Sequence, residues 1–285
     1  MVGVRAAPAA RLSVRVVDAG DHCPSFGTAV RHNGRVPRTL AVANQKGGVA
    51  KTTTVATLGA ALAELGLRVL LVDLDPQACL TFSVGIDPED LDKSIHHVLL
   101  GGVRARDVLI ELEDGPDLLP ATIALATAEV QLSRESGPEQ VLRTALRPLR
   151  PAYDWIIVDC PPTLGLLTVN GLSAASDVLI PLQCETLAHR GVGQLLDTVH
   201  DVQRLTNPGL QVLGVLPTLY DGRTTHARAV LETIADTYSL DVLQPAIPKS
   251  IRFAEAPAIG ETVLSTAPAS PGATAYRALA AALVH

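Results

Sequence analysis

Short apolar runs alternate with stretches of helical spacing from Arg38 onward. Runs such as 68–73 and 154–159 have four consecutive apolar residues between charged ends, which is typical of buried parallel strands. Between the runs, apolar residues recur every three or four positions, as in 52–65. This alternation predicts an α/β fold: a doubly wound, mostly parallel sheet flanked by helices. The predicted strands are 39–43, 68–73, 117–120, 154–159, 177–182, 211–217 and 242–247, and the predicted helices are 52–65, 122–135, 139–149, 165–175, 190–205, 224–238 and 272–284.

The first 37 residues lack this alternation. They are rich in Arg and Ala, with Pro and Gly scattered among them. We expect residues 1–37 to form a flexible N-terminal extension. No internal repeat or low-complexity tract divides the remainder, so residues 38–285 are predicted to form one domain.

Composition narrows the class of protein. The chain has 285 residues, of which 47% are hydrophobic and only 3% aromatic, as suits Ala/Val/Leu-rich helices packed on a parallel sheet. No apolar run reaches 18 residues and no apolar leader begins the chain, so we expect neither a membrane helix nor a secretory signal. Four cysteines without a C-x-x-C pair are typical of free thiols in a reducing cytoplasm. The predicted location is cytoplasmic.

Net charge argues against a generally basic nucleic-acid binder. The formal charge is −6 at pH 7. Any contact with DNA must therefore come from a local basic patch.

A phosphate-binding loop follows the first predicted strand. The plain pattern is G-x-x-x-x-G-K-[ST], and here Lys51 and Thr52 stand in place while Gln45 and Ala50 replace the two glycines. A second lysine, Lys46, lies five residues before Lys51. Its desolvation is offset only by contact with phosphate, either its own subunit's or a partner's. The predicted phosphate-binding residues are Lys46, Gly47, Gly48, Val49, Ala50, Lys51, Thr52 and Thr53.

Carboxylates follow two further strands. Asp73 ends the run 68–73 and Asp75 follows two residues later, so both are expected to point to the same side. Two like charges there need a cation or a proton-transfer role to offset their repulsion. Asp159 ends the run 154–159 as a single acid, the form of a Walker B segment. Because Mg²⁺ prefers oxygen ligands and keeps several waters, we expect Asp159 and the Thr52 hydroxyl to hold it.

Three segments together resemble the ParA family of DNA-partitioning ATPases, within the deviant-Walker ParA/MinD group. They are Lys-Gly-Gly-Val-Ala-Lys-Thr-Thr at 46–53, Val-Asp-Leu-Asp-Pro-Gln at 72–77 and Val-Asp-Cys-Pro-Pro at 158–162. Further matches are 164–170, 217–224 and 247–257. The resemblance covers about residues 38–284.

The resemblance implies a role for each matching residue at the nucleotide. Lys46 corresponds to the signature lysine that crosses an ATP-sandwiched dimer to the partner's nucleotide, and Lys51 to the phosphate-binding lysine. Asp75 corresponds to the acid that positions the attacking water. Thr52 and Asp159 correspond to the Mg²⁺ residues, and Pro248 to the adenine contact.

The resemblance also implies partners. Arg223 and Arg252 match the family's arginines for non-specific DNA binding, with Lys249 as a helper. The implied protein is an ATP hydrolase that uses ATP and Mg²⁺, forms an ATP-dependent homodimer, associates with the nucleoid and hydrolyses slowly until a ParB-like activator binds. The cargo, chromosome or plasmid, stays open.

Other functions remain possible for the same fold. A MinD-like membrane ATPase needs a basic amphipathic C-terminal helix, whereas 275–285 holds one arginine and no lysine. A metallocluster carrier needs clustered cysteines, and an amide-forming ligase needs a second substrate pocket. An orphan ParA-type ATPase would position another cargo.

The chain departs from the family pattern at three places. Ala50 replaces a common glycine before Lys51, and Ala78-Cys79-Leu80 replaces the commoner Gly-Asn-Ala. Lys249 replaces an arginine. None of these changes removes a predicted catalytic group.

Overall fold

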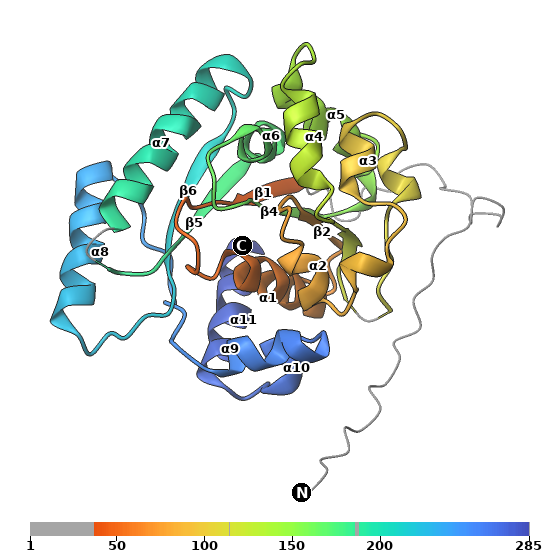
Figure 1. Cartoon of the computed structure of the whole chain (residues 1–285). Helices are drawn as coiled ribbons and strands as arrows, with labels where there is room; N and C mark the ends of the chain where they lie inside the picture. Colours follow the sequence, from red (N-terminus) through yellow and green to blue (C-terminus); the bar gives the residue numbers. More distant parts are fainter. Residues whose placement is uncertain (1–36, 114, 186–187, 285) are drawn as a thin grey trace, which may run out of the picture.

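Six parallel strands form a single sheet in the order β3-β2-β4-β1-β5-β6 (Figure 1). The structure is a computed structural model that describes residues 37–113, 115–185 and 188–284. The strands are β1 (Arg38–Val42), β2 (Val69–Asp73), β3 (Asp117–Leu119), β4 (Trp155–Asp159), β5 (Asp177–Leu182) and β6 (Gln211–Pro217). The predicted doubly wound α/β fold is confirmed. The predicted extension lies outside the described residues, apart from Pro37.

Helices cover both faces of the sheet (Figure 1). Side chains alternate along each strand: Ile156 and Val158 of β4 enter one core, while Trp155 and Ile157 enter the other. The first core is closed by α3 (Ile95–Leu99), α4 (Leu125–Leu132), α5 (Val141–Leu146), α6 (Leu166–Ala174), α7 (Ala188–Leu205) and α8 (Thr225–Tyr238). On the second face lie α1 (Lys51–Glu64), α2 (Cys79–Ser83), α9 (Arg252–Glu255), α10 (Val263–Thr266) and α11 (Pro271–Val284).

The predicted strand 242–247 is wrong. The structure shows two isolated parallel bridges here, Val215 with Val242 and Tyr220 with Pro248, and a separate bond from Ile247 N to the Pro217 carbonyl, in place of a continuous ladder. Pro245 lies between the two bridges and has no N–H to donate to a ladder, which disfavours continuous pairing here. The six other predicted strands are present, each within one residue of its predicted ends.

Two predicted helices are shorter than expected. The predicted helix 139–149 is a 3₁₀ turn, Pro138–Gln140, followed by α5, which ends before Pro148 because proline cannot continue the ladder. The predicted helix 122–135 is reduced to α4. Four helices were not predicted, α2, α3, α9 and α10, because four or five residues are too few to show a helical period.

Candidate functional site

The carboxyl ends of three neighbouring strands carry the candidate residues. The loop 43–50 leaves central strand β1, which pairs with β4 on one side and β5 on the other. In the parallel register, Asp159 of β4 lies beside both Val42 of β1 and Asp73 of β2. Loop, acids and the start of α1 therefore gather at one edge of the sheet, where ligands bind in this class of fold.

The loop is held in shape by buried polar contacts. Asn44 Nδ2 donates to the Pro181 carbonyl at 2.7 Å, and Asn44 Oδ1 accepts from Lys46 N at 2.9 Å. Thr218 Oγ1 donates to the Val49 carbonyl at 2.9 Å. Because both side chains are buried, these bonds fix the loop to β5 and to the segment after β6.

Ala50 has a left-handed backbone, with φ 64° and ψ 35°, at the N-cap of α1. Ala78 adopts the same conformation, φ 51° and ψ 32°, at the N-cap of α2. A Cβ in this region costs about 1–2 kcal/mol. Both alanines stand where the family commonly has glycine, and both adopt the left-handed backbone that glycine tolerates best. Both positions adjoin the candidate site.

The two lysines of the loop point to different partners. Lys51 is buried, and its Nζ donates to the Lys46 carbonyl at 3.1 Å. Burial lowers the pKa of Lys51, while the charge of Asp159 opposes that shift. Lys46 Nζ instead lies 2.5 Å from Glu185 Oε2, in a half-exposed ion pair just after β5. Of the two lysines, only Lys51 therefore has its ammonium group directed into the phosphate-binding loop.

Thr52 and Asp159 form a pair suited to a hard cation. Thr52 Oγ1 donates to Asp159 Oδ2 at 2.7 Å. The other oxygen, Asp159 Oδ1, is buried without a hydrogen-bond partner. An orphaned carboxylate oxygen beside a hydroxyl is the donor set that Mg²⁺ takes in phosphate sites, so these residues fit the ion.

Asp73 and Asp75 have different surroundings, unlike the paired acids expected from the sequence. The strand ends at Asp73, which is fully buried and accepts from Thr81 N, Thr81 Oγ1 and Asp75 N. Asp75 lies beyond the strand, half-buried. Burial raises the pKa of Asp73 to about 6, and burial together with Asp73 raises the pKa of Asp159. Three hydrogen bonds therefore hold the Asp73 carboxylate.

The predicted DNA residues emerge from two adjacent segments. Tyr220 N donates to the Ile247 carbonyl at 2.9 Å, which places the loop of Arg223 beside that of Pro248 and Lys249. Arg252 begins the short helix α9. All three basic side chains are exposed. Each arginine is paired with an acid on its own segment, Arg223 with Asp221 and Arg252 with Glu255, both at 2.9 Å.

Comparison with known proteins identifies the family. A family model described as an AAA domain matches residues 37–212. The chain is 46% identical to the chromosome-partitioning ATPase Soj of Thermus thermophilus, over 85% of this chain and 94% of that protein. It is 42% identical to the sporulation initiation inhibitor protein Soj of Bacillus subtilis, over 85% and 96%. The chain belongs to the ParA/MinD family of P-loop ATPases. The resemblance noted from the sequence is confirmed.

One similar solved structure carries the name of a biosynthetic enzyme. The chain is 57% identical to a protein described as cobyrinic acid a,c-diamide synthase from Mycobacterium smegmatis, solved with ADP and magnesium. The match has a TM-score of 0.78 and covers 87% of this chain and 94% of the other. That protein holds nucleotide and magnesium on a shared ParA/MinD fold. Its name corresponds to the amide-forming alternative raised above.

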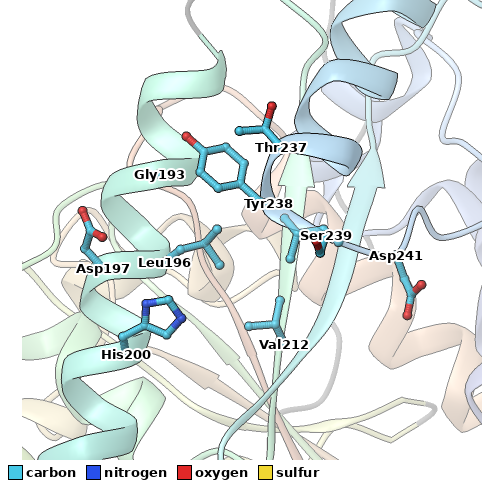
Figure 2. Close-up of a pocket in the computed structure, with 10 residues that line it drawn as sticks. Gly193, Leu196, Asp197, His200, Val212, Thr237, Tyr238, Ser239 and Asp241 are labelled. Atoms are coloured by element: carbon cyan, nitrogen blue, oxygen red, sulfur yellow. The ribbon is translucent and has the colours of Figure 1, made fainter.

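A pocket of about 620 Å³ lies apart from the P-loop of this ParA/MinD-family chain. It is formed by α7, the start of β6 and the end of α8. Figure 2 shows Asp197 and Asp241 on opposite sides of it. No P-loop residue and none of the strand-end acids lines it.

Four site residues escaped sequence reasoning. Asn44, Thr218 and Glu185 contact the loop, and Thr81 holds Asp73. Asn44 and Glu185 follow strands β1 and β5, so the rule that located Asp159 would also have flagged them. Thr218 and Thr81 carry no comparable signal, because hydroxyls are common and their partners are distant in sequence. Among the described residues, no helix is both long and apolar enough to cross a membrane.

Proposed function

We propose that this chain is a DNA-partitioning ATPase that dimerises around two ATP–Mg²⁺ and binds DNA without sequence preference in that state. The proposal rests on the different positions of the two lysine side chains of the loop. Lys51 is already turned into its own loop, whereas Lys46 is half-exposed and faces away from it. A cation so placed suits the nucleotide of a second subunit.

Within one subunit, each residue has a defined task toward ATP. The N–H groups of the loop and Lys51 bind the phosphate oxygens, and the N-terminus of α1 adds its dipole. Thr52 and Asp159 hold Mg²⁺, which neutralises charge on the β- and γ-phosphates. Pro248 pairs with Tyr220, two residues after the Thr218 that donates to the Val49 carbonyl of the loop, and we propose it as the adenine contact.

Asp75 is proposed to orient the attacking water. It is half-buried at the same strand edge, and Asp75 Oδ1 accepts from Gln77 N at 2.9 Å, which leaves the second oxygen for water. We infer slow turnover because, among the described residues, no further group beside Asp75 is placed to activate the water. Stimulation by a ParB-like activator accounts for faster hydrolysis.

The basic residues supply few DNA contacts per subunit. Two phosphate contacts from Arg223 and Arg252 give a slope of log K against log salt of about −1.8, and four in a dimer give about −3.6. Weak binding by the monomer thus becomes useful binding by the dimer. These slopes count the two arginines alone, and a phosphate contact from Lys249 would steepen both.

The test is equilibrium binding to random-sequence duplex DNA with ATP, with ADP and without nucleotide, at several salt concentrations. Partitioning predicts binding that requires ATP and falls steeply with salt. The variant Arg223→Glu with Arg252→Glu should lose DNA while its ATP-dependent dimer persists. DNA affinity that is unchanged in this variant contradicts the proposal. Binding to anionic liposomes only with ATP would favour the MinD-like alternative.

Amide synthesis is the second candidate, because of the Mycobacterium smegmatis neighbour. If ammonia came from glutamine by way of a cysteine nucleophile, that thiol would need a lowered pKa. Among the described residues, burial instead raises the pKa of Cys79, Cys160 and Cys184. The test is release of phosphate from ATP with cobyrinic acid and either glutamine or ammonia. Stimulation that depends on both substrates would favour the synthase.

A further inference from the structure

Two glycines join the helix after Asp75 to the segment that carries Arg252. Gly85 follows α2, and Gly260 follows the 3₁₀ turn Ala256–Ile259 that continues α9. Both have left-handed φ angles, +86° and +72°. A Cβ on Gly260 would lie 2.5 Å from Gly85 Cα, whereas a Cβ on Gly85 would lie 3.4 Å from Gly260 Cα. The two backbones therefore touch directly, and position 260 has no room for a side chain.

Helix α2 is tied to the strand end that precedes Asp75. Thr81 N and Thr81 Oγ1 donate to Asp73 Oδ2 at 2.9 and 2.8 Å, and Asp75 N donates to Asp73 Oδ1 at 3.1 Å. Ala121 N donates to Thr81 Oγ1 at 2.9 Å. One buried carboxylate thus binds both the Asp75 backbone and α2. The backbone of Asp75 is thus connected through Asp73 to α2, which leads to Gly85.

The opposite side of the Arg252 segment rests on α1 by way of α11. Phe253 packs edge-on against Tyr276, with ring centroids 5.9 Å apart. The Tyr276 hydroxyl lies 2.9 Å from Thr54 Oγ1, on the helix that begins at Lys51. Helix α9 and its turn therefore connect the helix that follows the P-loop to the helix that follows Asp75.

We propose that the Gly85–Gly260 contact couples the state of the nucleotide to the position of Arg252. When Asp75 engages the attacking water beside bound ATP, α2 shifts, and the backbone contact carries that shift to α9. Packed backbones transmit displacement because neither glycine has a flexible side chain that could absorb it. The inference rests on the proposed function, since it takes Arg252 as a DNA contact. Coupling is reciprocal, so DNA raises the affinity for ATP by the same factor.

The test compares Gly260→Ala with Gly66→Ala in the full chain. Gly66 also has a left-handed φ, +78°, but nothing lies within 4 Å of a Cβ there. Both variants bear the same backbone strain, and only Gly260→Ala disturbs the contact. The readout is the ratio of Kd for duplex DNA with ADP to Kd with ATP. We expect a loss of at least about fivefold in this ratio for Gly260→Ala and none for Gly66→Ala. An unchanged ratio in Gly260→Ala overturns the inference.

Hydrogen exchange in the wild-type chain gives a second test that needs neither the variant nor DNA. Gly260 N donates to the Pro257 carbonyl and Glu261 N to the Ala256 carbonyl, both at 3.1 Å. Replacing ADP with ATP should change the exchange of these two amides. Unchanged exchange refutes the coupling even if DNA binding follows ATP. A wild-type chain that shows the exchange response but binds no DNA refutes the proposed function alone.

Discussion

Lys46 Nζ is paired with Glu185 Oε2 of its own subunit at 2.5 Å. The lysine proposed to reach a partner's nucleotide is therefore held beside β5 in the single chain. In the proposed dimer, this ion pair is exchanged for contact with phosphate. The pair is half-exposed, so its contribution is small, in the range of about 0.2–1 kcal/mol.

Removal of the Glu185 charge should favour the dimer. Glu185→Gln frees Lys46, and the dimer dissociation constant with ATP should fall by up to about fivefold. Analytical ultracentrifugation measures this constant. Glu232→Gln on α8 is the matched control, since it removes the same charge from an exposed site away from the loop. A weaker dimer in Glu185→Gln would mean that Glu185 supports Lys46 instead of restraining it.

Relief of backbone strain at Ala50 should stabilise the protein. Ala50→Gly removes about 1–2 kcal/mol of left-handed strain but adds about 0.4–1 kcal/mol of unfolded-chain entropy. A net gain of about 0.5 kcal/mol is expected from these two terms, read as a higher urea midpoint. Ala60→Gly, inside α1, should instead cost about 1 kcal/mol. Loss of stability in both variants would contradict the strain argument.

The stability of the nucleotide-free protein should depend on the buried acids. Asp73 and Asp159 both have raised pKa values, so the folded state holds their protons more tightly than the unfolded state does. Their contribution to the free energy of unfolding therefore falls as pH rises from about 4 through about 6. Asp159→Asn should gain stability over wild type at about pH 7 relative to about pH 4.5, measured by urea denaturation without Mg²⁺. A difference that is equal at both pH values would show that burial does not perturb this pair.

The acids beside the two arginines should compete with DNA. Asp221 and Glu255 each hold one of these arginines in an exposed pair. Asp221→Asn and Glu255→Gln should each tighten DNA binding about twofold in the ATP state, because the arginine is freed and a charge that repels phosphate is removed. Fluorescence anisotropy with labelled duplex DNA measures the change. Unaltered affinity in both variants would place the DNA surface elsewhere.

The sequence predicted the candidate site best where its residues lie close together in the chain and take part in the same function. Lys46, Lys51 and Thr52 lie on one loop, and the strand 155–159 carries Asp159 at its end. The fold followed from the same strand and helix periods. The prediction of strand 242–247 was wrong because it gave the apolar pattern more weight than Pro245 within it.

The pattern of apolar and polar residues could not predict contacts between segments that are far apart in the chain. Glu185 lies 139 residues from Lys46, and Gly260 lies 175 residues after Gly85. The different surroundings of Asp73 and Asp75 also depend on Thr81, whose hydroxyl has no distinctive spacing. Such relationships arise from how β2, α2 and the later segments pack, and they carry no local period.

The molar mass of the chain with ATP and Mg²⁺ tests the dimeric switch most directly. Light scattering on Asp75→Ala, which should bind ATP without hydrolysing it, is expected to give about 60 kDa, twice the 29.8 kDa of one chain. The same variant with Lys46→Ala should stay at the mass of one chain, as should both proteins with ADP. A dimer that persists in the Lys46→Ala background, or a single-chain mass in all four samples, would contradict the account.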